Sequence, residues 1–250
     1  MAYLCRLVNK SFFVIMRKPI IFILFILLAG AGIFLYLYKG GELFKAMFGG
    51  KNIREGVIEY EVAYPKLDPH SMVAAVLPNK AYLRFKNNNM ITEMSGMMFS
   101  ISYISNQSNK SVEQTFSLLN QKSVSDISAA DMKRLNGSFL SSIEDGKQVK
   151  KIAGLVCKEA IVKLQTGEVI HVYYTQDIGI DNPNWSNPYS KIDGVLMDFQ
   201  LESYGLSMHL SAKTVLPKKI EDSSFEVSSD YHKTPLGELE KILRAAVSSN

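Results

Sequence analysis

A run of twenty residues without a charge, Pro19 to Tyr38, constrains this chain more than any other feature. It reads PIIFILFILLAGAGIFLYLY. A helix of that length spans roughly 30 Å, the thickness of the hydrocarbon core of a bilayer. Basic residues precede the run, and two tyrosines and a lysine end it in the manner of interfacial anchors: Arg17, Lys18, Tyr36, Tyr38 and Lys39. The run predicts one transmembrane helix that binds membrane lipid.

A cleaved signal peptide is the alternative interpretation of this run. The apolar stretch is longer than a usual h-region and no A-x-A-like site follows it, so an uncleaved anchor is favoured. The first eighteen residues carry four basic residues and no acidic one, which favours a cytoplasmic N-terminus. Basic residues also follow the run, so their number alone does not set the orientation. We expect a basic segment at 1–18, the helix at 19–38, a connector at 39–52 and a periplasmic domain at 53–250, anchored in an inner membrane by a single pass.

Within the predicted helix, Gly30, Ala31 and Gly32 form a patch of small residues. Such a patch lets a second helix pack closely, although small residues are common in membrane helices in general. We therefore keep these three residues as a candidate contact with a partner.

From Ile53 onward, hydrophobic residues recur with a period of two. In GVIEYEVAY, one face carries Ile58, Tyr60, Val62 and Tyr64, as in a half-buried antiparallel strand. The same criterion predicts strands at 80–86, 90–94, 97–105, 111–119, 148–152, 156–165, 168–176, 194–202 and 206–215. Thr166-Gly167 and Tyr204-Gly205 provide two-residue hairpin turns.

Two segments break this alternation and predict helices. Residues 125–142 fit an insertion helix capped by Asp126, and 236–247 fit a short C-terminal helix. Meandering strands with one apolar face favour a curved antiparallel sheet. The predicted fold is mainly β, and the periodicity leaves barrel, half-barrel and sandwich open.

Composition and spacing argue against several function classes. The net charge of +4 comes from scattered basic residues, whereas nucleic-acid binding usually shows a clustered basic face. Cys5 and Cys157 lie on opposite sides of the predicted membrane segment, and the four histidines lack metal-ligand spacing. We expect no nucleic acid, no metal and no cofactor.

Cys157 is the candidate for a reactive thiol. A nucleophile needs a base within hydrogen-bond reach, and His171 on the neighbouring predicted strand is the only plausible one. A buried cysteine that acts as a small hydrophobic residue fits the pattern as well. We therefore expect a protein that is not an enzyme.

Two further groups of side chains are candidates for binding. The polar loop DNPNWSNPY carries Trp185 and Tyr189, and exposed loop aromatics often mark contact sites. Methionines gather in one predicted strand pair, Met90, Met94, Met97 and Met98. Methionine suits adaptable apolar pockets and ordinary cores alike, so these four either line an apolar ligand or fill the core.

The second half of the chain resembles the GLPGLI-type family of exported Bacteroidota proteins of unknown function. Three segments carry the resemblance: KKIAGLVCKEAIV at 150–162, VIHVYYTQDIGI at 169–180, and YSKIDGVLMDFQLESYGLSMHLSAKTV at 189–215. Within the third, IDGVLMDF stands where the family has its glycine-led signature. This stretch departs from the full signature, so the chain resembles a divergent member. The resemblance implies export across the inner membrane and an all-β fold, with a weaker analogy to the curved sheet of periplasmic lipoprotein carriers.

Two functions follow from these observations. The first is a membrane-anchored accessory protein whose periplasmic domain binds a protein partner, as a subunit of an envelope complex. The second is a carrier that shields an apolar ligand in the concave face of its sheet.

Overall fold

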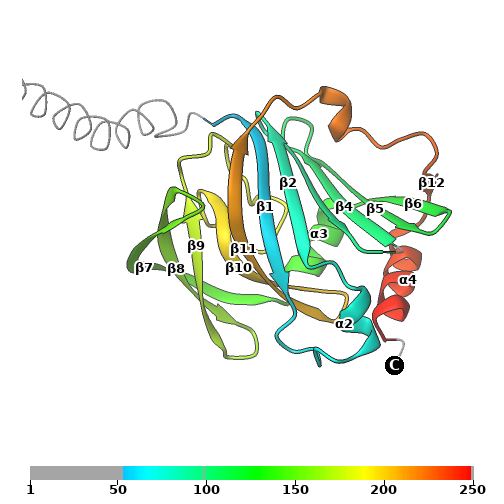
Figure 1. Cartoon of the computed structure of the whole chain (residues 1–250), viewed down its shortest axis with the longest axis horizontal. Coiled ribbons are helices and arrows are strands. Elements are labelled where there is room, and N and C mark those ends of the chain that lie inside the picture. Colours follow the sequence, from blue (N-terminus) through cyan, green and yellow to red (C-terminus); the bar gives the residue numbers. More distant parts are fainter. Residues whose placement is uncertain (1–52, 98, 249–250) are drawn as a thin grey trace, which may run out of the picture. The chain divides into compact units, whose positions relative to one another are not determined.

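One twelve-stranded sheet organises residues 53–97 and 99–248, the part of the chain that this computed structural model describes (Figure 1). The strand order is β12-β6-β5-β4-β3-β2-β1-β11-β10-β9-β8-β7. Neighbouring strands in this order run antiparallel to each other, except β12, which runs parallel to β6. The strands are β1 Glu55–Ala63, β2 Lys80–Lys86, β3 Asn89–Ser95, β4 Phe99–Asn106, β5 Ser111–Leu118, β6 Gln121–Asp126, β7 Leu140–Ile152, β8 Leu155–Leu164, β9 Val169–Thr175, β10 Val195–Ser203, β11 Leu206–Pro217 and β12 His232–Lys233.

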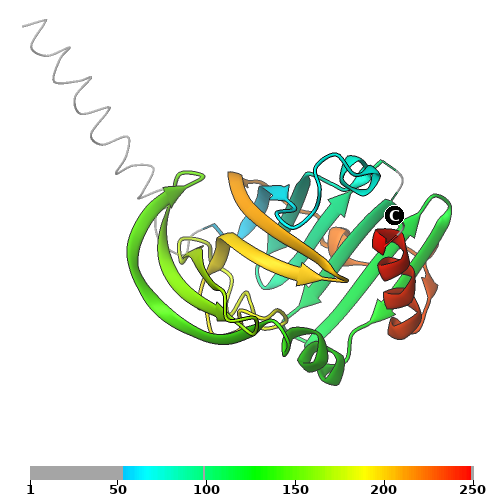
Figure 2. The same cartoon turned by 90° about the horizontal axis from the view of Figure 1, so that it is seen from below.

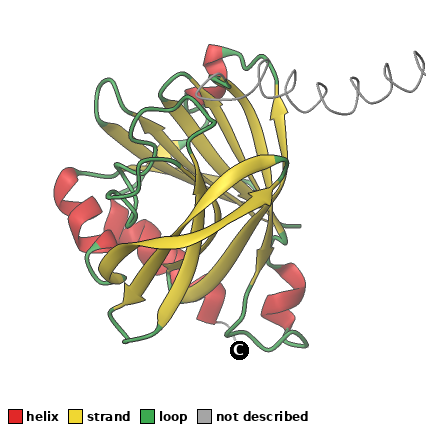
Figure 3. Ribbon diagram, turned by 90° about the vertical axis from the view of Figure 1, so that its left-hand side faces the viewer, coloured by secondary structure: helices red, strands yellow, loops and turns green. Residues whose placement is uncertain are grey.

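The prediction of a mainly β fold with a curved sheet is confirmed. Figures 2 and 3 show the sheet rolling around a concave side while its two edge strands stay apart. Both predicted tight turns are present, with left-handed backbone at Gly167 (φ 90°), Tyr204 (φ 53°) and Gly205 (φ 89°).

Three strand segments were not predicted, and the shortest of them is β12, which has two residues. The other two are longer. These are β6 and the first half of β7, whose sequences QKSVSD and LSSIEDG lack an apolar alternation. In β6 the buried positions are Val124 and Ser125, and the Ser125 hydroxyl donates to the Thr234 carbonyl at 2.6 Å. A buried hydroxyl with an internal acceptor fits a strand, but it gives no hydrophobic signal in the sequence.

The described helices are short. They are α2 Met72–Val76, α3 Ala129–Asn136, α4 Leu236–Ser248 and the 3-10 turn η1 Asp222–Phe225. The insertion helix and the C-terminal helix were predicted, whereas α2 was not. The predicted cap at Asp126 is wrong, because Ser128 caps α3 in a capping box with Asp131 and Asp126 belongs to β6.

The sheet curls far enough for its middle to contact its far side. At the tip of the β10–β11 hairpin, the Tyr204 hydroxyl donates to Gln114 Oε1 on β5. On the same side, Leu239 and Leu243 of α4 pack on Phe116. The hairpin tip and α4 therefore cover part of the concave face of β4 and β5 (Figure 2).

The β7–β8 hairpin bends at Glu159. The β7 register shifts between Asp145 and Val149, so the extra residues bulge opposite Glu159. Glu159 is 4% exposed, and its Oε2 accepts the N–H groups of Lys147 and Gln148 at 3.0 Å each. Along β8 the buried positions are odd up to Glu159 and even afterwards, so the buried side of the strand changes at this bend.

Among the described residues, no helix is long and apolar enough to cross a membrane. The predicted membrane segment 19–38, with Gly30, Ala31 and Gly32, and the connector 39–52 lie outside the described residues.

Candidate functional site

The concave side of the sheet encloses a cavity of about 1020 Å³. Its walls are the inner faces of β1 to β5, β10 and β11, together with α2, α3, α4 and residues 183–188. This volume lies at the upper end of the range of small-molecule sites, roughly 300–1,000 Å³. The cavity is therefore the candidate binding site of the domain.

Hydrophobic side chains make up most of the cavity wall. Met94, Ile101 and Phe116 stand directly opposite one another on β3, β4 and β5, because the three strands pair in that register. Other strands and helices add further apolar members: Val73, Val76, Leu77, Pro78, Leu83, Met90, Phe99, Leu118, Leu135, Phe139, Val195, Leu196, Phe199, Leu201, Leu206, Met208, Leu210 and Leu243. Strand alternation thus places one apolar face toward an open space.

Four tyrosines line the cavity, and each hydroxyl is bound within the protein. Tyr60 donates to the Leu196 carbonyl at 2.8 Å, and Tyr64 donates to the Pro78 carbonyl at 2.7 Å. Tyr103 donates to the Ser186 carbonyl at 3.1 Å, and Tyr204 donates to Gln114. The tyrosines therefore offer ring carbons, not free hydroxyls, to a ligand.

Burial keeps these tyrosines protonated. It raises the pKa of Tyr103 and of Tyr204 to about 12, and it raises the pKa of Tyr60 and Tyr64 even further. No phenolate forms near neutral pH, so these rings bring no negative charge into the cavity.

The charged residues of the lining are Arg134, Arg244 and Glu202, and all three are exposed. The Arg134 guanidinium bonds Glu240 on α4 at 2.6 Å and Asp131 at 3.3 Å. This ion pair joins α3 to α4 at the rim. The charges therefore stay where water can reach them, and the polar groups deeper in the lining, such as Thr92, Ser105 and Gln114, are uncharged.

Local contacts hold the non-sheet walls in place. Ser71 caps α2 by accepting the Ala74 N–H at 3.2 Å, and Val73 points inward with 6% exposure. In the loop at 181–194, buried Asn184 donates to the carbonyls of Ile192 and Gly194 at 2.8 Å each. These walls come from a five-residue helix and a loop, which hydrophobic periodicity does not predict.

Of the four predicted methionines, Met90 and Met94 line the cavity. Met97 does not, because it lies in the β3–β4 turn and is 89% exposed. Met98 lies outside the described residues.

The prediction that Tyr189 is an exposed contact is wrong. Tyr189 is fully buried, with its ring centre 6.2 Å from that of Phe139 and 6.1 Å from that of Phe199. Its hydroxyl donates to the Gln200 carbonyl. Trp185 is half-buried, with the Lys110 ammonium 4.8 Å from its ring centre. Because the neighbours of Tyr189 in the sequence are polar, the sequence pattern did not indicate that this residue belongs to the core.

The structure does not support a nucleophilic Cys157. The side chain has no exposed surface, and burial raises the pKa of its thiol to about 11. His171 Nδ1 lies 2.8 Å from Glu159 Oε1, so its described partner is a carboxylate. Cys157 therefore fits the alternative of a small buried hydrophobic residue.

Polar pairs also lie along β8 to β11. Asp198 bonds Lys150 at 2.9 Å and His209 at 2.6 Å, and the Lys150 ammonium lies 3.5 Å from the ring centre of Tyr173. Among the described residues, no three His, Cys, Asp or Glu side chains are grouped as metal ligands would be. We interpret these pairs as cross-strand contacts of the sheet.

Comparisons with known proteins bear on the fold alone. No family model and no curated protein matches the chain. Among solved structures, the chain is similar to PNGF-II in space group P21, with 15% identity and a TM-score of 0.50, covering 77% of this chain and 34% of that one. PNGF-II in space group C2 matches with 15% identity and a TM-score of 0.49, covering 77% and 33%. The chain thus spans about one third of the length of these structures.

Proposed function

We propose that the described domain holds an apolar ligand in its concave cavity and acts as a carrier. The observation that supports this most is an apolar space of about 1020 Å³ whose tyrosine hydroxyls are all bound to the protein itself. Each Å² of apolar ligand surface removed from water contributes about 25 cal/mol, so such a wall favours hydrocarbon over polar solutes.

The N-terminal sequence gives this proposal a location. The charge-free run at 19–38 would anchor the carrier in an inner membrane, with its domain in the periplasm. A tethered carrier takes its ligand from, or gives it to, the same membrane. This role is compatible with an exported protein of the GLPGLI type.

Extraction of the purified full-length protein tests this proposal. We expect mass spectrometry to find a lipid in stoichiometric amount. Ile101→Trp puts a larger side chain into the cavity, so this variant should carry no lipid. Ser100→Trp changes the opposite face of β4, so this variant should still carry it. Equal lipid content in both variants would contradict binding in the cavity.

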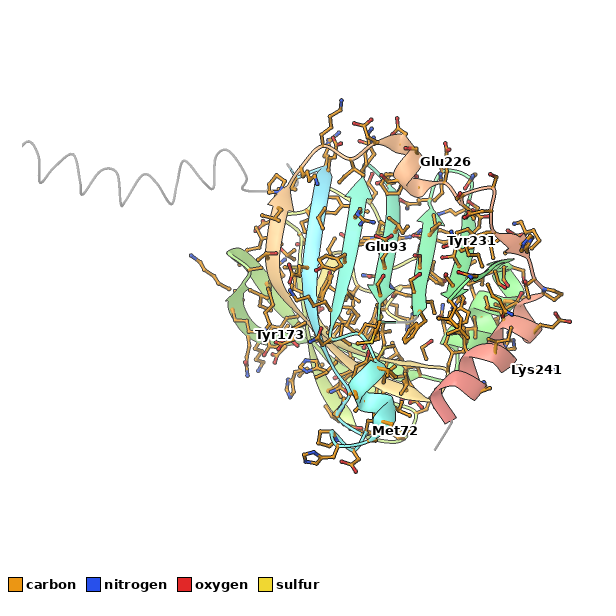
Figure 4. All side chains as sticks on the ribbon, turned by 45° about the vertical axis from the view of Figure 1, so that its right-hand side comes forward. Met72, Glu93, Tyr173, Glu226, Tyr231 and Lys241 are labelled. Atoms are coloured by element: carbon orange, nitrogen blue, oxygen red, sulfur yellow. The ribbon has the colours of Figure 1, made fainter. Side chains whose placement is uncertain are left out.

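A second candidate function is protein binding, supported by an apolar rim that we define as Met72, Val76, Met97 and Leu119. Their exposed fractions are 85%, 38%, 89% and 71%. The β3–β4 and β5–β6 turns share one end of the sheet because Phe99 pairs with Leu118, and Figure 4 shows Met72 on α2 at its lower end. Exposed apolar clusters of this kind are typical of contact surfaces.

A pull-down in mild detergent tests this second candidate. We expect a membrane or periplasmic protein to co-purify with the full-length chain and to be lost when Met72 and Met97 are both replaced by Ser. Retention of that protein by the double variant would exclude the apolar rim as the contact.

A further inference from the structure

One row of side chains crosses the inner face of the sheet at a single level. Strand register places these residues opposite one another in the order Ile58, Leu83, Thr92, Tyr103 and Gln114. The row therefore changes from apolar on β1 and β2 to polar on β3, β4 and β5. The next row, Met94, Ile101 and Phe116, is apolar throughout.

Gln114 is the most deeply buried polar member of this row, with 3% exposure. Its Oε1 accepts the hydroxyl of Tyr204, whereas its Nε2 donates to none of the described residues. That nitrogen keeps some surface that water can reach. Gln114 lines the cavity and its Oε1 is bound to Tyr204, so the Nε2 N–H group is the donor that it has left for a ligand.

When an apolar chain fills the cavity and displaces its water, this donor needs an acceptor from the ligand, since leaving it unpaired costs free energy. We propose that the ligand is an acyl compound whose carbonyl oxygen accepts from Gln114 Nε2 while its chain lies on Met94, Ile101 and Phe116. This inference rests on the proposed carrier function and narrows its ligand class from any hydrocarbon to an acyl group.

The charges around the site favour a neutral acyl carbonyl. Gln114 is neutral, and Arg134 at the rim is bound to Asp131 and Glu240. The two arginines of the lining, Arg134 and Arg244, are exposed. A carboxylate placed at buried Gln114 would therefore lose its hydration in exchange for charges that water and salt screen. An ester or amide carbonyl avoids that cost. A free fatty acid could supply a carbonyl oxygen at the same place, and the experiment below distinguishes the two.

Displacement of a fluorescent alkyl probe from the full-length protein in nanodiscs tests the inference. The competitors share one chain length: methyl palmitate, palmitic acid, hexadecanol and hexadecane. We expect methyl palmitate to displace the probe about tenfold more effectively than hexadecane, as one neutral hydrogen bond predicts. If palmitic acid displaces more probe than methyl palmitate does, the carbonyl oxygen that accepts from Gln114 comes from a free acid and not from an ester.

Three variants separate recognition from structure. Gln114→Met removes the donor, and Gln114→Glu puts an acceptor in its place, so both should bind ester and hydrocarbon equally. Tyr204→Phe removes the bond between Gln114 and the hairpin but keeps the donor, so it should retain the ester preference. Loss of the preference in Tyr204→Phe to the same extent would overturn the inference, because Gln114 would then act only through the hairpin.

The outcomes also distinguish this inference from the proposed function. Equal displacement by methyl palmitate and hexadecane from the unmodified protein would overturn the acyl assignment and leave the carrier standing. Displacement by none of the four competitors would remove both.

Discussion

The inner parts of the sheet differ in whether neighbouring side chains fill the space between them. In β8, β9 and β10, Val162, Val172 and Met197 have no exposed surface; we call this part the packed wing. In β3, β4 and β5, Met94, Ile101 and Leu118 are only partly buried and face the cavity; we call this part the hollow wall. The two regions show that strand alternation determines which side is covered but not whether that side is filled.

Truncation of one methionine in each region gives the largest expected contrast. Met197→Ala creates a void in a packed region and should lower the free energy of unfolding by about 2–5 kcal/mol. Met94→Ala only enlarges an existing space and should cost about 1 kcal/mol or less. Trp185 is the single tryptophan of the chain, so its fluorescence can follow urea unfolding of both variants. Equal losses would contradict the distinction between the two regions.

The close packing of the β7 bulge on Glu159 is the second feature to test. A Cβ at Gly146 would stand 2.3 Å from Glu159 Cγ, and Glu159 is held by two backbone N–H groups. Gly146→Ala should therefore cost about 1–3 kcal/mol of unfolding free energy. The control is Gly237→Ala in α4, where a Cβ meets nothing within 4 Å. A neutral Gly146→Ala would show that the bulge relaxes freely.

Acid should weaken the packed wing through Glu159. The Gln148 N–H, followed by the His171 and Lys147 bonds, holds the pKa of its carboxyl below the ordinary 4.5. A lowered pKa stabilises the fold above the unfolded-chain pKa, and this contribution is lost as pH falls toward the folded pKa. Urea midpoints measured from about pH 5 to about pH 3 should fall less steeply for Glu159→Gln than for the unmodified chain. The exposed Glu168→Gln should keep the original slope.

The smallest effect is expected at Cys157. Because the thiol is buried and its pKa is raised to about 11, a maleimide at pH 8 should label it only as fast as the domain opens. Labelling in urea provides the reference rate. A native rate equal to that reference would contradict a packed wing and revive Cys157 as a reactive group.

Much of the sheet could be predicted because its strands alternate. The expected strand at 80–86 coincides with β2, and the turns at Gly167 and Gly205 lie where their sequences place them. The phase change at Glu159 was not predictable, because it depends on a bulge in a different strand.

The cavity could be predicted only in part. Met90 and Met94 marked its wall, but a methionine in a strand looks the same whether it faces a neighbour or a void. Gln114 gave no signal, since its role depends on Tyr204 from a hairpin ninety residues away in sequence. The other walls come from α2 and the loop at 181–194, where sequence spacing does not determine contacts.

Photo-cross-linking tests the central claim most directly. A diazirine-bearing alkyl probe would be activated on the purified full-length protein, and the labelled peptides would be mapped by mass spectrometry. We predict labels on the hollow wall, on peptides that contain Met94, Ile101 or Phe116. Labels confined to residues 19–38 or to the apolar rim would contradict a ligand in the cavity.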